Sequence, residues 1–219
     1  MKKEHDIRID RTKLHPWLNY KLTLLLKQCA KKGIYLIITQ GFRSKAEQDA
    51  LYAQGRTKKG KIVTNAKGSD YSSQHQWGIA FDIALKYDVD GDGRITDDTY
   101  NNKGIKKVAK IAKSKKVGLA WGGDWVSPVD TPHFYLDKWG DTPSKLKKKY
   151  GVFNNFKKTW TKEVFGTKKG LNIWNKTRTK VLKKKLPNKT KVNVMYIGKG
   201  YAKVEYNGVV GYMKTKYLL

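Results

Sequence analysis

The period with which apolar residues recur changes along the chain, and this change divides the chain into two parts. Up to about residue 140, helical patterns alternate with short apolar runs rich in β-branched residues. After residue 166, apolar and polar residues alternate, as over 191–196 and 202–206, which is typical of half-buried strands. Asn207-Gly208 separates two such runs and predicts a two-residue hairpin turn. The sequence therefore predicts an α+β domain followed by a small all-β domain.

The first domain is expected over residues 1–150 and the second over 167–219, joined by a basic linker over 151–166 that is irregular or in part helical. In the first domain we expect helices over 16–32, 44–54 and 102–115, and strands over 34–39, 78–85, 117–121 and 133–136. Ser44 and Glu47 form a capping-box pattern at the start of the second helix. The second domain is near the lower size limit for a core that folds by itself.

The chain carries a strong positive charge, with 47 Lys and Arg against 18 Asp and Glu, a net charge of +29. Residues 151–219 hold 17 basic and 2 acidic residues, so their charge density exceeds that of residues 1–150. This balance favours a polyanionic partner, either nucleic acid or anionic polymers of a cell wall. The alternative is that lysine simply fills solvated faces. Base-specific recognition of nucleic acid is not expected, because it relies on bidentate arginine, and lysine dominates here.

Several classes of protein are excluded by composition. A single cysteine rules out a disulfide scaffold and a cysteine-rich zinc module. No apolar run approaches ~18 residues, so no transmembrane segment is expected. The first residues are basic but are followed by no apolar stretch, so we expect no signal peptide. A protein of this kind would need another route to any site outside the membrane.

Two of the four histidines lie in dense patterns that suit a metal site. His75 precedes Asp82 by seven positions, and Gly78 between them allows a sharp turn into a strand. Ala80 and Asp82 then share one face of that strand, because side chains alternate with a period of two. A histidine of the turn and an aspartate of the strand can therefore converge, with His133 from a neighbouring strand as a third ligand. Catalytic zinc takes three such ligands and leaves one position open.

Two further side chains suit hydrolysis at such a site. Zinc lowers the pKa of a bound water towards ~7, and a carboxylate must then carry the proton to the leaving group. Asp130, three residues before His133, is placed to do this. Arg43, at the end of a predicted strand, is placed to stabilise an oxyanion. Either histidine alone would be read as an ordinary buried or surface residue, but the combination favours a metal centre.

These motifs resemble the LAS-type zinc peptidases, which have the hedgehog/DD-peptidase fold. More narrowly, the chain is similar to L-alanyl-D-glutamate endopeptidases and VanY-like D,D-carboxypeptidases. The matching residues are Ser73, His75, Gly78, Ala80 and Asp82, together with Gly41-Phe42-Arg43-Ser44, Glu47-Gln48, Leu51-Tyr52, Gln54-Gly55-Arg56-Thr57, Trp121-Gly122-Gly123-Asp124-Trp125 and Pro132-His133-Phe134. The resemblance covers about residues 10–140 and implies an antiparallel sheet with flanking helices.

The resemblance also implies roles for single residues. His75, Asp82 and His133 are expected to bind Zn²⁺, Asp130 to act as general base and then acid, and Arg43 to stabilise the tetrahedral intermediate. Many relatives have glutamate where this chain has Asp130, and the shorter side chain leaves Asp124 as an alternative proton carrier. We favour Asp130 by its register. Two further residues are expected close to the zinc or the substrate, and these are Ser73 and Trp121.

The last 50 residues resemble a bacterial Src-homology-3-like module, a small barrel that holds enzymes on cell walls. The resemblance rests on Gly170-Leu171-Asn172-Ile173, Val194, Tyr201 to Val204, Asn207-Gly208 and the run from Gly211 to Leu218. A peptidase followed by such a module, without a signal peptide, resembles a phage endolysin. Such an enzyme is made in the host cytoplasm and reaches the wall through a membrane hole. The expected partners are peptidoglycan and anionic wall polymers, and the expected state is a monomer.

A second metal site is suggested by an acidic loop. Its pattern matches the first eight positions of a calcium-binding loop, where carboxylates at positions 1, 3 and 5 precede a glycine. The residues concerned are Asp88, Asp90, Asp92, Gly93, Arg94, Asp97 and Asp98. The bidentate glutamate expected at position 12 is replaced by Thr99. Bound Ca²⁺ and a solvated acidic turn both remain open.

The leading interpretation is a zinc endopeptidase that cuts the L-Ala–D-Glu bond of peptidoglycan. A D,D-carboxypeptidase that removes terminal D-Ala would share the same metal site, so the motifs do not separate the two. An inactive wall-binding protein would keep the fold without the complete set of catalytic residues, which this chain retains. A nucleic-acid binder ranks last, because it would have no use for the zinc ligands.

Overall fold

The computed structural model describes residues 4–88, 91, 93–95, 103–137 and 142–219. The chain divides into two compact units, which we describe separately. The first comprises Met1–Leu14 and Leu18–Phe153, and the second comprises His15–Trp17 and Asn154–Leu219. Among the helices of the described residues, none has the length and apolar character that a membrane span requires.

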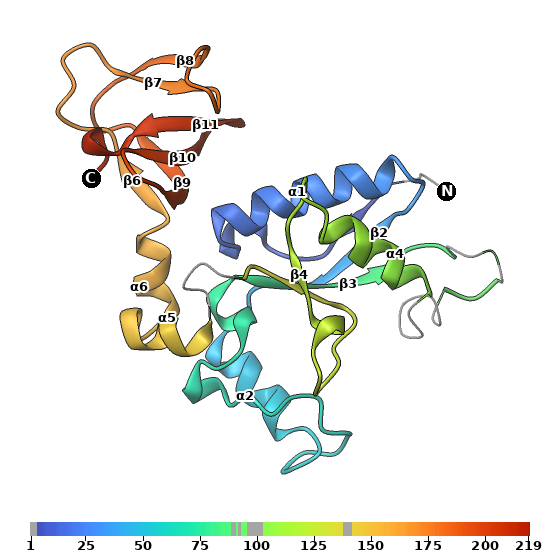
Figure 1. Cartoon of the computed structure of the whole chain (residues 1–219). Coiled ribbons are helices and arrows are strands. Elements are labelled where there is room, and N and C mark those ends of the chain that lie inside the picture. The colour runs from blue at the N-terminus through green and yellow to red at the C-terminus, as the bar shows by residue number, and fades with distance from the viewer. Residues whose placement is uncertain (1–3, 89–90, 92, 96–102, 138–141) are drawn as a thin grey trace. The chain divides into compact units, whose positions relative to one another are not determined.

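A five-stranded sheet forms the centre of the first unit (Figure 1). Its strands lie in the order β1 (Asp6–Ile7), β2 (Leu36–Gln40), β3 (Ala80–Leu85), β5 (His133–Tyr135) and β4 (Ala120–Trp121). Only the β1–β2 pair is parallel, and the other pairs are antiparallel. The long, nearly continuous apolar strand β3 therefore lies in the middle, where it is covered on both sides by neighbouring strands.

Two helices of this unit pack through apolar residues that recur at helical spacing. The helices of the unit are α1 (Pro16–Ala30), α2 (Lys45–Ala53), α4 (Lys103–Ala112) and α5 (Pro143–Tyr150). α1 buries Leu18, Leu22 and Leu25, and α4 buries Ile105 and Val108. Figure 1 shows α2 on the side of the sheet opposite to α1. Beneath the helices, the stacked rings of Phe81 and Phe134 join β3 to β5 with centroids 6.0 Å apart.

The capping box expected at the start of α2 is confirmed. The hydroxyl of Ser44 accepts a hydrogen bond from the backbone N–H of Glu47 at 3.2 Å. In return, the Glu47 carboxylate accepts one from the backbone N–H of Ser44 at 2.7 Å. This reciprocal pair satisfies two donors at the helix start and fixes the direction in which the chain leaves β2. It thereby helps to place the preceding residue, Arg43.

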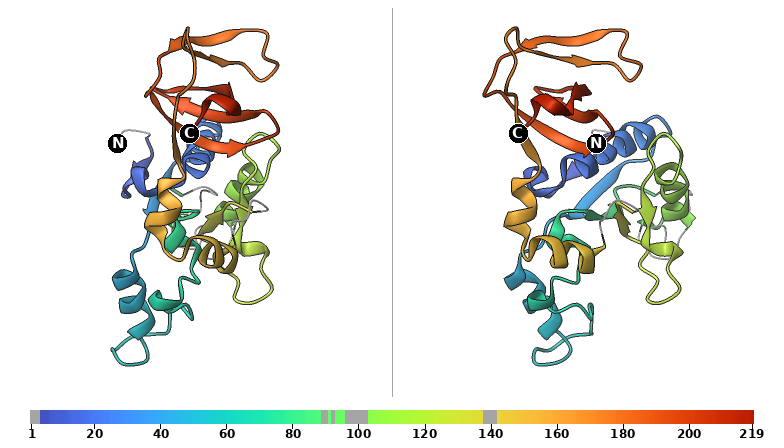
Figure 2. Two further views of the ribbon diagram at one scale, coloured as in Figure 1. Left: turned by 90° about the vertical axis from the view of Figure 1, so that its left-hand side faces the viewer. Right: turned by 60° about the vertical axis from the view of Figure 1, so that its left-hand side comes forward.

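The second unit is built on a six-stranded sheet. It contains α6 (Phe153–Lys158) and the strands β6 (Thr161–Glu163), β9 (Lys191–Ile197), β10 (Tyr201–Tyr206), β11 (Val209–Lys214), β7 (Leu171–Trp174) and β8 (Val181–Leu186), the strands being given in sheet order. Figure 2 shows the β7–β8 hairpin lying over the β9–β11 strands. Between them lies a core of Val164, Leu171, Ile173, Leu186, Val192, Val194, Ala202, Val204 and Met213.

The hairpin expected at Asn207-Gly208 is confirmed. Both residues have positive φ, 45° and 78°, as a type I′ turn requires.

The region expected as a linker contains α6 and β6, and β6 pairs with β9. Among the described strands, β6 and β8 lie at the two edges of the sheet and do not pair with each other. The strand pairing therefore does not close into a barrel. β8 has no alternating pattern because Lys183 to Lys185 are all exposed.

The expected calcium loop lies largely outside the described residues, which omit Asp90, Asp92, Asp97 and Asp98. In the described part, the Asp88 carboxylate accepts hydrogen bonds from the backbone N–H groups of Gly91 and Gly93, each at 2.7 Å. Arg94 is exposed. The prediction of a calcium site therefore stays a prediction.

Replacing the capping serine should weaken the first unit. We expect Ser44→Ala to lower the free energy of unfolding by about 1 kcal/mol, because the N–H of Glu47 loses its acceptor. That corresponds to a melting temperature lower by roughly 2–4 °C in a chain of this size. Circular dichroism during heating measures it, with Ser72→Ala, an exposed serine outside any helix, as control. Equal melting temperatures for both variants would contradict the capping role.

Candidate metal centre

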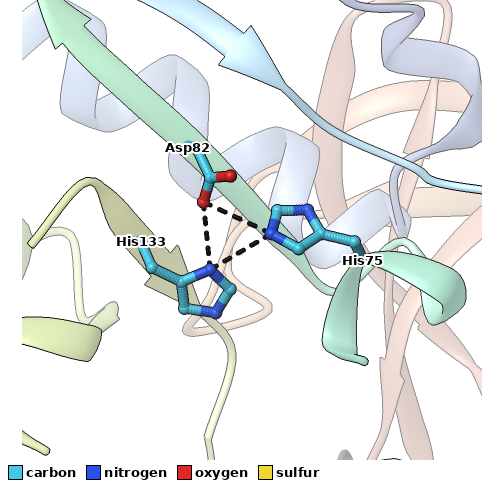
Figure 3. Close-up of side chains that lie close together, drawn as sticks. All are labelled: His75, Asp82 and His133. Atoms are coloured by element: carbon cyan, nitrogen blue, oxygen red, sulfur yellow. Dashed lines mark hydrogen bonds and ion pairs between the residues drawn. The ribbon is translucent and has the colours of Figure 1, made fainter. Parts of the chain in front are cut away.

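Three potential metal ligands converge on one point of the sheet of the first unit (Figure 3). Asp82 lies in the middle of β3 and is paired directly with His133, the first residue of β5. Directly opposed residues of antiparallel strands point to the same face, so their side chains meet. His75 reaches the same point from the 3-10 turn Gln74–Trp77, which precedes β3. The convergence expected from the sequence is therefore confirmed.

Gly78 makes the turn before β3 possible. Its φ of 63° lies in the left-handed region that favours glycine, and its N–H donates to the carbonyl oxygen of His75 at 3.1 Å. The chain thus reverses immediately after the turn that holds His75 and enters β3 two residues later. This explains physically why a glycine stands between the two ligands in the sequence.

The three ligand atoms lie within contact distance of one another. The Nδ1 atom of His133 is 3.0 Å from Oδ1 of Asp82, and the Nε2 atom of His75 is 3.3 Å from the same oxygen. The two imidazole nitrogens are 3.2 Å apart. Both histidines are almost completely buried, with 4% and 3% of their surface exposed.

Hydrogen bonds to the outer nitrogens decide which imidazole atoms hold protons. Nδ1 of His75 lies 2.7 Å from the carbonyl oxygen of Gly41, which can only accept, so the proton resides on this nitrogen. Nε2 of His133 lies 2.7 Å from the amide oxygen of Gln74 and carries the proton for the same reason. The nitrogens that face each other therefore present lone pairs. Together with the Asp82 oxygen they form three acceptors that call for a cation, and their donor set fits a divalent metal such as zinc.

The electrostatics of Asp82 suit a metal ligand. Burial alone would raise the pKa of this carboxyl group, but the two imidazoles beside it, those of His75 and His133, hold its pKa well below the usual range. The carboxylate therefore remains ionised throughout the neutral range. A half-buried, ionised carboxylate in this position favours a positive charge close by.

Arg43 lies beside this centre with part of its guanidinium free. Its backbone N–H donates to the carbonyl oxygen of His75 at 3.1 Å, which joins the end of β2 to the turn. Its Nη1 donates to the amide oxygen of the fully buried Gln48 at 2.9 Å. Burial lowers the pKa of Arg43, an effect that the charges of Asp82, Glu47 and Asp130 oppose. Among the described residues, the buried Nε of Arg43 has no hydrogen-bond partner.

Asp130 is the second carboxylate close to the centre. Its backbone N–H donates to Gly122 at 3.1 Å, and its carbonyl oxygen accepts from the N–H of His133 at 3.3 Å. Gly122 permits this close approach, because a Cβ there would lie 2.5 Å from the carbonyl oxygen of Asp130. Burial raises the pKa of Asp130, which the charge of His133 opposes and that of Asp82 reinforces. A raised pKa suits a group that accepts and then releases a proton.

The structure places the other expected site residues elsewhere. Asp124 is exposed, and both of its oxygens accept from Nζ of Lys113 at 2.9 Å, so it is engaged in a surface ion pair. Trp121 is only 6% exposed and donates through Nε1 to the carbonyl oxygen of Thr131, so it belongs to the core. Ser73 lies at the start of the turn, where its N–H donates to Gln76 at 3.4 Å. Asp124 thus has a surface partner in Lys113, and Asp130 remains the expected proton carrier.

Three further residues lie near the centre. Gln74 contacts His133 as described above. The ring of Trp125 lies 5.0 Å and that of Tyr135 lies 5.6 Å from the imidazole of His133, centroid to centroid. Trp125 also donates through Nε1 to the hydroxyl of Tyr135 at 2.9 Å. The signal for Tyr135 was present in the sequence, because a period of two places it on the same face of β5 as His133.

Comparison with known proteins agrees with this geometry. A family model described as D-alanyl-D-alanine carboxypeptidase, of the peptidase M15 group, matches residues 67–136, which include all three ligands. The peptidoglycan L-alanyl-D-glutamate endopeptidase CwlK of Bacillus subtilis (strain 168) is 43% identical over 133 residues, covering 56% of this chain and 73% of that protein. The chain belongs to the peptidase M15 family.

Two weaker similarities accompany these. The L-alanyl-D-glutamate peptidase of Listeria phage A118 is 29% identical over 114 residues, which are 52% of this M15 chain but only 34% of the phage protein. The solved structure of the Serratia marcescens L-Ala D-Glu endopeptidase ChiX also matches. The match covers 61% of this chain and 86% of the ChiX chain, at 20% sequence identity. Its TM-score of 0.35 is too low to inform the fold.

A divalent metal should stabilise this M15 chain through the three converging acceptors. Adding Zn²⁺ to metal-free protein at 100 times its dissociation constant would add about 2.7 kcal/mol to the free energy of unfolding. We expect a melting temperature higher by roughly 5–10 °C, measured by circular dichroism. Asp82→Asn, which removes the carboxylate charge, should lose most of this increase, whereas Asp124→Asn should keep it. An equal increase in both variants would contradict the assigned centre.

Proposed function

We propose that this protein is a zinc-dependent endopeptidase that cleaves the L-Ala–D-Glu bond in the stem peptide of peptidoglycan. The convergence of His75, Asp82 and His133 beside Arg43 and Asp130 carries the proposal, because it combines a metal site with a charged donor and a carboxylate. Membership of the M15 family and the similarity to CwlK support the substrate. The proposed scissile bond is that of the related L-alanyl-D-glutamate endopeptidases.

The metal centre explains how this chain would hydrolyse an amide. Zinc, when bound, supplies a Lewis acid that activates water for attack on a carbonyl carbon at neutral pH. His75, Asp82 and His133 are the three ligands that the chain offers, and they leave a fourth position for water or substrate. The hydrogen bonds from His75 to Gly41 and from His133 to Gln74 hold both rings in the orientation that the ligand atoms need.

Asp130 and Arg43 would carry the remaining chemistry. Asp130 accepts the proton of the attacking water and passes it to the nitrogen of the leaving amino group, as general base and then general acid. Burial raises the pKa of Asp130, which favours uptake of the proton. Arg43 offers its guanidinium to the oxygen that becomes negatively charged in the tetrahedral intermediate. A fixed, half-buried guanidinium at this point costs little reorganisation during the reaction.

A D,D-carboxypeptidase that removes terminal D-Ala is the second candidate. The match of residues 67–136 to the D-alanyl-D-alanine carboxypeptidase family favours it. Both reactions would use the same ligands, Asp130 and Arg43, so the metal centre does not separate them. The difference lies in whether the cleaved bond is internal or terminal, which a product analysis decides.

We propose further that the second unit binds the cell wall as a Src-homology-3-like module. The unit carries most of its charge as exposed lysines, among them Lys183, Lys184 and Lys185 on β8. Such a surface would attract anionic wall polymers, with a salt-dependent contribution to binding. The similarity of the first unit to a Listeria phage peptidase supports a role of the whole protein as an endolysin.

Peptidoglycan digestion tests the proposed reaction. We expect the purified protein to release fragments with new L-Ala carboxyl and D-Glu amino ends, as measured by mass spectrometry. A chelator should stop the release, and added Zn²⁺ should restore it. Loss of terminal D-Ala alone would replace the endopeptidase assignment by the carboxypeptidase, and chelator-resistant cleavage would contradict the metal mechanism.

Neutralising the general base should stop turnover but leave the metal centre intact. We expect Asp130→Asn to lower kcat by roughly 10²–10⁴, because the amide cannot accept the proton. Asp124→Asn should retain most of kcat, since it loses only a surface ion pair with Lys113. Zinc content measured by atomic absorption should be equal in the two variants. A comparable loss of kcat in both would mean that the proton carrier is misassigned.

A further inference from the structure

Gln74 links two metal ligands that lie on different elements. It directly precedes His75 in the turn before β3, and its side chain reaches His133 on β5, 59 positions along the chain. The contact joins Oε1 of Gln74 to Nε2 of His133 at 2.7 Å, the short end of the range for such a hydrogen bond. The other outer nitrogen of the centre, Nδ1 of His75, is held by the backbone oxygen of Gly41. Only the hydrogen bond of His133 therefore depends on a side chain.

The hydrogen bond to Gln74 counteracts a competing state of His133. A neutral imidazole carries one proton, on either Nδ1 or Nε2. Oδ1 of Asp82 lies 3.0 Å from Nδ1 and is a strong acceptor, so without a metal it favours the proton on Nδ1. A protonated Nδ1 cannot bind a metal. The Gln74 oxygen favours the opposite arrangement, with the proton on Nε2 and a lone pair on Nδ1.

Among the neighbours of His133, Gln74 is the residue placed to select which ring nitrogen carries the proton. The rings of Trp125 and Tyr135 pack against the imidazole and restrict its tilt. Aromatic packing does not select which nitrogen carries the proton, however. Among the described residues, the contacts of the His133 ring nitrogens are those with Gln74, Asp82 and His75. Of these, Gln74 alone faces the outer nitrogen.

We infer that Gln74 is a positioning residue that fixes the tautomer and orientation of His133 and thereby sets the zinc affinity of the centre. The inference rests on the proposed zinc-dependent function. Groups that accept from the outer nitrogen of a metal-bound histidine typically contribute 10- to 100-fold to metal affinity. Gln74 should therefore act on metal binding first and on turnover only through it.

Zinc affinity of the full-length, metal-free chain tests this inference without any peptidoglycan. The dissociation constant is measured by competition with a chromophoric zinc chelator. We expect Gln74→Met, which keeps the side-chain length but removes the acceptor, to weaken zinc binding by roughly 10- to 100-fold. Gln74→Glu retains an acceptor and should bind zinc at least as tightly as the wild type. Gln28→Met makes the same change on α1 and should bind as the wild type does.

The outcomes separate this inference from the proposed function. Tight zinc binding by Gln74→Met, or weak binding by Gln74→Glu, would overturn the role of Gln74 and leave the metal centre in place. No zinc binding by the wild type would refute the centre itself, and the role of Gln74 with it. The melting temperature of each metal-free variant controls for folding. If Gln74→Met has a lower melting temperature than the wild type, the zinc affinity of Gln74→Glu becomes the test of the role of Gln74.

Discussion

The direct pairing of Asp82 with His133 across β3 and β5 is the constraint on which the rest of the site depends. It places a half-buried carboxylate and a buried imidazole side by side on one face of the sheet. The turn ended by Gly78 then adds the imidazole of His75. With their lone pairs turned towards one another, these three acceptors favour a cation between them. The fold thus brings together a donor set that could hold a metal.

The site also shows how a strongly basic protein can maintain a local negative charge. Asp82 and Asp130 are both half-buried, and their pKa values depart from the usual range in opposite directions. The imidazoles lower one pKa, while burial and the charge of Asp82 raise the other. Both carboxylates also act on Arg43, because their negative charges oppose the decrease in its pKa that burial causes. One carboxylate is therefore suited to bind a metal and the other to exchange a proton.

Much of this site could be predicted from the sequence because its signals are local. The spacing of His75, Gly78 and Asp82 encodes a turn followed by a strand, and a period of two predicts which residues share a face. The start of α2 was equally predictable, from Ser44 and Glu47. The contact of Gln74 with His133 was not, because it joins residues 59 positions apart through one flexible side chain.

Other features failed to be predicted for the same physical reason. The ion pair of Asp124 with Lys113 and the deep burial of Trp121 could not be read from the sequence. β8 carries three consecutive exposed lysines, so no alternation announced a strand that its pairing with β7 stabilises. Tertiary contacts outweigh local propensity in each of these cases.

The measurement that tests this account most directly is anomalous X-ray diffraction at the zinc absorption edge, on crystals of the full-length chain grown with Zn²⁺. The account predicts a strong anomalous peak bounded by Nε2 of His75, Nδ1 of His133 and Oδ1 of Asp82, with Nε2 of His133 still facing Gln74. A peak elsewhere, or none at this point despite bound zinc in solution, would contradict the assignment of these residues as the metal centre.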